Sequence, residues 1–174
     1  MKQPLLVVVF ALFAVLCRAS AQTDPQTSEA RLLQGTWKLI SYVGEEVPSG
    51  ARADVMGPHP SGYINYGPDG RMIVIIVGTG RSKPAGPVAT PAEAEVLMRS
   101  MLAYAGTYTV DTHAKTVTHQ IDVSWDESRT GGSFVRTYRL DGDRLTLITP
   151  ASTDPANGRK TVRKIGRASC RERV

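Results

Sequence analysis

Gly35-Thr36-Trp37-Lys38-Leu39-Ile40-Ser41-Tyr42 is the stretch of sequence that decides the fold. A glycine is followed two residues later by a tryptophan and then by alternating apolar positions, which is the pattern of a half-buried strand. We expect the indole of Trp37 to seal one end of a β-barrel as a structural plug. Small closed barrels commonly enclose a ligand. The pattern therefore predicts the architecture and directs the search for function to the barrel interior.

Outward from this stretch, turn residues divide the chain into short strands. Gly67-Pro68-Asp69-Gly70 and Asp141-Gly142-Asp143 have the composition of tight turns. Both faces of 71–77 are apolar, so we expect both to be covered. The expected strands are 36–43, 62–66, 71–77, 106–111, 116–125, 133–140, 144–149 and 160–164. Short strands joined mostly by hairpins predict an all-β fold, an antiparallel up-and-down eight-stranded barrel.

Two helices are expected beside the strands, a short N-terminal one and one inserted after the third strand. The first covers 28–34, with Ser28 as its N-cap and Gly35 as its stop. Thr90-Pro91-Ala92-Glu93 has the pattern of a capping box and predicts the inserted helix over 90–105. This second helix either caps the end of the barrel or forms an adaptable lid, with Met98 and Met101 over the mouth.

The N-terminal end has the three parts of a signal peptide. Met1-Lys2-Gln3 is basic, 5–16 is apolar, and Ala19-Ser20-Ala21 offers small residues for cleavage before Gln22. The apolar run is shorter than the roughly 20 residues that a membrane-spanning helix needs. We therefore expect residues 1–21 to be removed from an exported protein, periplasmic or secreted, with no stable membrane insertion.

The C-terminal end is unusual. The segment 165–174, Ile-Gly-Arg-Ala-Ser-Cys-Arg-Glu-Arg-Val, resembles one reading frame of a common sequencing adapter. A lone Cys170 among arginines also makes little sense in an exported protein. We interpret 165–174 as adapter read-through, and the genomic sequence beyond codon 164 distinguishes this from a genuine basic tail. The domain then covers 22–164, which is long enough to bury a single core.

Charge and cysteine content depend on how these two ends are interpreted. The whole chain has 21 basic and 16 acidic residues and a formal net charge of +5. Without 1–21 and 165–174 the formal net charge falls to +1, and both cysteines, Cys17 and Cys170, are lost. Such a balance gives no argument for binding nucleic acid or an anionic membrane. The domain is expected to fold without a disulfide.

Motifs spread over nearly the whole of 22–164 carry a family resemblance. They are Gly35-Thr36-Trp37, Pro60-Ser61-Gly62-Tyr63-Ile64-Asn65-Tyr66, Asp69-Gly70-Arg71-Met72, Tyr104-Ala105-Gly106-Thr107-Tyr108-Thr109-Val110-Asp111, Val117-Thr118-His119 and Leu140-Asp141-Gly142-Asp143-Arg144-Leu145. In order and spacing they resemble the lipocalin-like domain family of compact microbial proteins. The resemblance implies a lipocalin-like barrel, and most family members have no assigned activity. The family's usual Trp-Glu-Arg ending on the last strand is missing, and 165–174 begins where that ending should lie.

His119 is the first candidate functional residue. Alternation along 116–125 places five residues on one inward face, namely Val117, His119, Ile121, Val123 and Trp125. A polar group on an inward face needs a hydrogen-bond partner. That partner is a neighbouring protein group, a bound ligand or, least favoured, a metal ion. His59 lies in a loop and His113 in a turn, so no spacing brings three metal ligands together.

Arg136 is the second candidate, because it shares one face of 133–140 with Phe134 and Tyr138. If this face points inward, Arg136 offers a cation to an acidic group on an otherwise apolar ligand; if it points outward, Arg136 is solvated. Tyr63 and Tyr66 lie on opposite faces of one strand, so at most one of them points inward. The remaining candidates for ligand contact are Tyr66, Tyr108, Tyr138, Met98 and Met101.

No catalytic constellation is recognisable in 22–164. The segment has no Gly-x-Ser-x-Gly elbow, phosphate-cradling loop, His-x-x-x-His pair or cysteine. We expect no cofactor and no metal, and we favour a monomer that binds a small, mostly apolar molecule in the barrel interior. The alternative is an isomerase or cyclase type of enzyme that uses the same cavity, with His119 as acid or base. A third hypothesis is a barrel packed solid with side chains and used through its surface.

Overall fold

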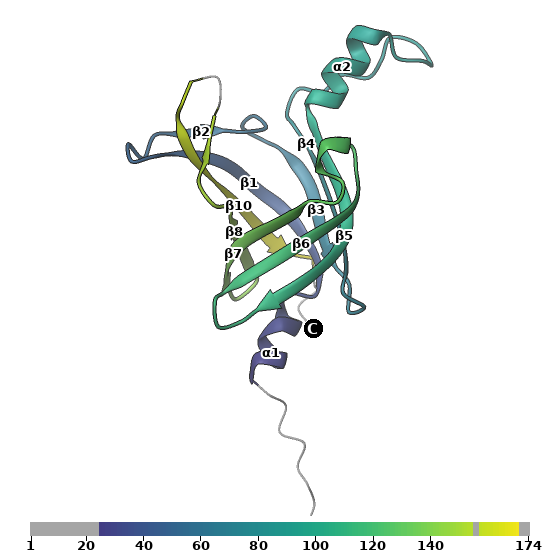
Figure 1. Cartoon of the computed structure of the whole chain (residues 1–174). Coiled ribbons are helices and arrows are strands. Elements are labelled where there is room, and N and C mark those ends of the chain that lie inside the picture. The colour runs from purple at the N-terminus through teal and green to yellow at the C-terminus, as the bar shows by residue number, and fades with distance from the viewer. Residues whose placement is uncertain (1–24, 155–156, 171–174) are drawn as a thin grey trace, which may run out of the picture.

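The computed structural model describes residues 25–154 and 157–170. The expected signal peptide over 1–21 lies outside the described residues. Figure 1 shows a barrel of tilted strands, with α1 at one end and α2 projecting from the other. The elements are α1 (Pro25–Leu32), β1 (Gly35–Val47), β2 (Arg52–Asp54), β3 (Ser61–Tyr66), β4 (Arg71–Val77), α2 (Pro91–Arg99), β5 (Met101–Asp111), β6 (Thr116–Ser124), η1 (Glu127–Arg129), β7 (Ser133–Asp141), β8 (Arg144–Ile148), β9 (Ser152–Thr153) and β10 (Lys160–Ser169).

Eight of the strands form a closed ring. Their order is β1-β3-β4-β5-β6-β7-β8-β10, and antiparallel pairing of β1 with β10 closes it. This confirms the predicted antiparallel eight-stranded barrel. The short strands β2 and β9, which were not predicted, extend the sheet beside the far ends of β1 and β10. Neither helix is long and apolar enough to cross a membrane, within the part of the chain that is described.

The end of the barrel near α1 is closed by Trp37. Its side chain is buried, and Nε1 donates a hydrogen bond to the carbonyl oxygen of Leu33, 2.7 Å away. The helix α1 is also tied to the ring, because Glu29 accepts hydrogen bonds from Tyr138 and Lys115. The predicted start of this helix at Ser28 is wrong. It begins at Pro25, since proline fits the first turn of a helix.

Two β-bulges change which side chains point inward. In β1 the register shifts between Leu39 and Ser41, so that Tyr42 joins the inner face. In β6 the pairing with β5 skips Asp122, and Val123 is therefore 59% exposed instead of buried. The prediction for Val123 is wrong, because a bulge reverses the inward and outward alternation beyond it.

The inserted helix is shorter than predicted and does not cap the barrel. The capping box of Thr90 and Glu93 is present as expected, but α2 ends at Arg99 and 101–105 belong to β5. None of its residues is buried, and Figure 1 shows it standing away from the ring. The backbone of 101–105 pairs with β4 instead of continuing the helix, because Leu102 and Tyr104 on the inner face then join the core.

The outer face of β4 is not covered, contrary to the expectation for 71–77. Ile73 and Ile75 are 56% and 46% exposed, whereas Met72, Val74 and Ile76 are buried. A single-layered barrel has a core on one side of its sheet only. A shallow apolar depression results on the outside of β4, β5 and β6.

The last strand is longer than predicted. It continues beyond Lys164 to Ser169 and pairs with both β1 and β8. Main-chain hydrogen bonds hold this pairing, and backbone groups of almost any sequence can form them. The pairing therefore corrects the predicted end of the strand.

Candidate functional site: a cavity between an apolar and a cationic wall

A cavity of about 240 Å³ lies inside the barrel, at the end opposite to α1. Its apolar wall is built by Ile64, Val74, Ile76 and Leu102, which come from the adjoining strands β3, β4 and β5. Across the ring, η1, β7 and β10 contribute Arg129, Arg136, Arg163 and Arg167. No described residue on the cavity wall is acidic. The interior is thus apolar on the β3–β5 side, whereas on the opposite side the arginines lie among Phe134, Leu147 and Ile165.

Arg136 points inward, so the inward alternative for its strand face is the one observed. Its side chain is only 9% exposed. One guanidinium nitrogen, Nη1, lies 3.3 Å from His119 Nδ1 and 3.2 Å from the carbonyl oxygen of Phe134. The guanidinium carbon lies 5.4 Å from the ring centre of Phe134 and 5.9 Å from that of Tyr104. Aromatic faces and one fixed hydrogen-bonded edge therefore hold this cation in place.

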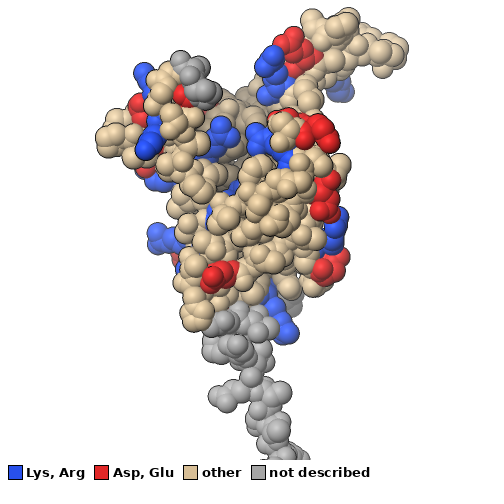
Figure 2. All heavy atoms as spheres, in the orientation of Figure 1, with Lys and Arg blue, Asp and Glu red and all other residues tan. Residues whose placement is uncertain are grey.

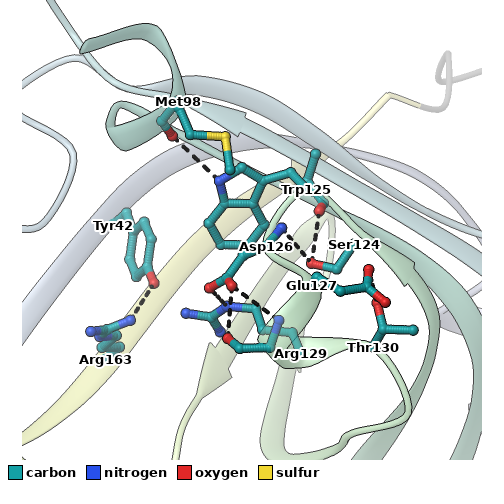
Figure 3. A network of polar contacts seen from close by, with 11 residues as sticks. Tyr42, Met98, Ser124, Trp125, Asp126, Glu127, Arg129, Thr130 and Arg163 are labelled. Atoms are coloured by element: carbon teal, nitrogen blue, oxygen red, sulfur yellow. Dashed lines mark hydrogen bonds and ion pairs between the residues drawn. The ribbon is translucent and has the colours of Figure 1, made fainter. Parts of the chain in front are cut away.

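The rim of the cavity carries two further arginines, which Figure 3 shows with their partners. Arg129 forms an ion pair with Asp126, 3.2 Å away, and stacks 5.0 Å from the centre of the Trp125 ring. Arg163 donates from Nη1 to the hydroxyl oxygen of Tyr42, 3.3 Å away. Arg129 is thus neutralised by a carboxylate, whereas Arg163 has no ion pair among the described residues.

His119 lies behind the cavity wall and is fully buried. Its Nδ1 faces the Tyr104 hydroxyl at 3.1 Å and Arg136, and its Nε2 faces the Tyr66 hydroxyl at 2.8 Å. Because a guanidinium can only donate, Nδ1 is the acceptor, and we assign the ring proton to Nε2, which donates to Tyr66. Burial, with Arg136 and Arg167 nearby, holds the pKa of His119 well below its ordinary value. The imidazole is therefore neutral, and both its nitrogens have protein partners.

The family assignment rests on a comparison over most of the chain. A family model described as lipocalin-like domain matches residues 34–168. The chain belongs to the lipocalin-like domain family. No curated protein sequence gives a significant match. The observed barrel agrees with this assignment, and a lipocalin-like barrel suggests ligand binding in general.

The other predicted contact residues of this lipocalin-like domain lie away from the cavity wall. Tyr66 is fully buried beside His119 and Tyr108, and the Tyr108 hydroxyl donates to the carbonyl oxygen of Gly67, 2.8 Å away. Tyr138 faces α1, where its hydroxyl donates to Glu29. Of the residues predicted to contact a ligand, only Arg136 lines the cavity.

The two methionines lie on different elements, and neither lines the cavity. The side chain of Met98 is 46% exposed on α2, and its carbonyl oxygen accepts a hydrogen bond from Trp125 Nε1, 3.3 Å away. Met101 is the first residue of β5 and pairs with Val77. The expected arrangement of a helical lid carrying both residues is therefore not the arrangement observed.

Sequence reasoning missed Tyr42, Tyr104 and Arg163 on the cavity wall. Tyr42 reaches the interior only because of the bulge in β1, which has no clear sequence signal. Tyr104 fell within the predicted helix. Its alternation with Leu102 and Gly106 on the buried face of β5 is a signal that could have identified it.

Arg167 differs from the other arginines of the cavity wall because two of its buried nitrogens have no hydrogen-bond partner. It is 2% exposed, Nε and Nη1 have no hydrogen-bond partner, and burial lowers its pKa to about 10. An unpaired buried cation is strongly unfavourable. Arg167 also lines the cavity, so it adds a second buried positive charge to the wall.

Within the described residues, no group of three or more His, Cys, Asp or Glu side chains is placed to hold a metal ion.

Proposed function

We propose that this chain is an exported lipocalin-like protein that binds a small, mostly apolar molecule inside its barrel as a monomer. The observation that carries the proposal is the cavity of about 240 Å³ with its wall of Ile64, Val74, Ile76 and Leu102. Ligand cavities commonly measure about 300–1,000 Å³, so the ligand is expected to be smaller than a typical drug molecule. Export is supported by the signal-peptide pattern of 1–21.

The enzyme alternative has less support. A general acid or base must come within hydrogen-bond reach of the group it protonates or deprotonates. His119 does not line the cavity, and Tyr66, Tyr104 and Arg136 occupy its two nitrogens. No observation favours this alternative over simple binding.

Native mass spectrometry of protein purified without detergent tests the proposal. A matched pair of variants on β4 controls for the site: Ile76→Trp fills the cavity, whereas Ile75→Trp adds the same side chain on the outer face, where Ile75 is exposed. We expect a small-molecule adduct, either retained from the cells or added as an apolar probe, on the natural chain and on Ile75→Trp. The adduct should be absent from Ile76→Trp.

An empty natural chain that binds no added apolar probe would contradict the proposal and favour a barrel used through its surface. An adduct that persists in folded Ile76→Trp would place the ligand elsewhere. Near-ultraviolet circular dichroism of both variants shows whether each retains the packed barrel.

A further inference from the structure

We infer that the ligand carries a carboxylate, which Arg136 binds, while its apolar part lies against the β3–β5 wall. This inference rests on the proposed function and specifies the chemical class of the molecule bound.

The charge of the cavity favours an anion. The residue Arg136 is 9% exposed and forms no ion pair within the described residues. An isolated buried charge is unfavourable unless an opposite charge compensates it. Asp126 is already paired with Arg129, and no described residue on the cavity wall is acidic. A ligand anion supplies the missing counter-charge.

The geometry of Arg136 favours a carboxylate as that anion. All the hydrogen bonds that Arg136 makes within the described residues use Nη1, which leaves Nε and Nη2 as donors. A planar guanidinium binds a planar carboxylate through two parallel hydrogen bonds. The rings of Phe134 and Tyr104 restrict the position of the guanidinium before the ligand arrives, and such preorganisation increases affinity.

Arg163 adds to the positive potential without contacting Arg136. It lies on the cavity wall, and its only side-chain partner among the described residues is the neutral Tyr42 hydroxyl. Lys and Arg atoms are visible in the hollow between the projecting β1–β2 and α2 regions in Figure 2. We therefore expect Arg163 to attract an anion to the mouth and to contribute less to its final binding. Neither Arg136 nor Arg163 belongs to 165–174, whereas Arg167, which lines the same cavity, does.

Three probes that share one apolar body test the inference by isothermal titration calorimetry at pH 7.5. They are 3-phenylpropanoate, 3-phenylpropan-1-ol and 3-phenylpropylamine, which differ in head group only. We expect the carboxylate to bind about 10- to 100-fold more tightly than the alcohol, as for a hydrogen-bonded buried charge pair. The amine should bind most weakly.

Substitutions of single arginines identify the residue that confers the preference for the carboxylate. Arg136→Met should abolish the preference for the carboxylate, Arg136→Lys should retain part of it, and Arg163→Met should reduce carboxylate affinity only a few-fold. Arg139→Met is the matched control, because Arg139 lies on the same strand with its side chain exposed, and it should change nothing. Should Arg136→Met fail to fold, Arg136→Lys still tests the two-point geometry.

Equal binding of the alcohol and the carboxylate, abolished for both by Ile76→Trp, would overturn the inference and leave the proposed function intact. A carboxylate preference unchanged in Arg136→Lys and Arg136→Met would also overturn it. Failure of all three probes to bind would overturn the inference and the proposed function together.

Discussion

At the scale of single residues, His119 organises the interior of the barrel. It links Tyr66, Tyr104 and Arg136, which come from three different strands. Its acceptor nitrogen fixes one edge of the Arg136 guanidinium and so directs the other edge away from the histidine. On this view His119 is a positioning residue for Arg136, and its neutral form is required because a protonated imidazole would repel the guanidinium.

The buried neutral His119 predicts a specific loss of stability in acid. Its folded pKa lies below the ordinary value of 6.5, so the unfolded chain binds the extra proton first as the pH falls. Folding stability should therefore be fully present above pH 6.5 and should decrease below it, by up to about 1.4 kcal/mol per pH unit, until the folded pKa is reached. The charged groups that act on His119 are Arg136 and Arg167, and both lower its pKa further.

Chemical denaturation between pH 7.5 and pH 5 measures this effect. His119→Gln, which cannot titrate, should lose the decrease between pH 6.5 and 5, although it is less stable at pH 7.5 by roughly 1–3 kcal/mol because its hydrogen bonds change. His59→Gln is the control, since His59 is exposed in a loop, and it should keep the decrease. An identical pH profile for His119→Gln and the natural chain would show that His119 is not the titrating group.

At the scale of elements, two-residue alternation predicted most strands and the inward position of Val117, His119 and Ile121. It failed beyond each bulge, because one extra residue reverses the alternation and leaves no clear mark on composition. It also failed where two local preferences compete. The residues 101–105 fit the apolar face of a helix, but pairing with β4 and burial of Leu102 and Tyr104 decide their conformation.

The exposed position of α2 predicts a mainly local response to loss of its N-cap. Thr90→Ala removes the hydroxyl that accepts a hydrogen bond from the Glu93 backbone N–H, and such an N-cap contributes about 1 kcal/mol to a helix. Because α2 has no buried residue, we expect backbone amide exchange in α2 to become roughly fivefold faster, while the melting temperature changes by less than about 1 °C. Hydrogen exchange by mass spectrometry, together with a thermal melt, measures both quantities.

Glu95→Ala serves as the control for Thr90→Ala, because it removes an exposed ion pair with Arg99 on the same helix and leaves the cap intact. A fall of several degrees in melting temperature on replacing Thr90 would indicate that α2 is part of the barrel's cooperative unit.

At the scale of the whole molecule, the two ends of the barrel differ, because one is closed and the other holds the cavity. Trp37, Leu33 and α1 close one end, and the opposite end holds the cavity with its cationic wall. The sequence predicted the closed end well, because a tryptophan plug is a local feature. The cavity could not be predicted in the same way. It depends on which side chains from β3–β5 face those from β7 and β10 across the ring, and only the closed topology determines this.

The central claim is that the ligand binds inside the barrel with its carboxylate on Arg136. A crystal structure with 3-(4-bromophenyl)propanoate tests it most directly, since the bromine locates the apolar end by anomalous scattering. We predict a bromine peak beside Ile64, Val74 and Ile76, with the carboxylate at hydrogen-bond distance from Arg136. A peak confined to the outer apolar depression beside Ile73, Ile75 and Val123 would contradict the claim.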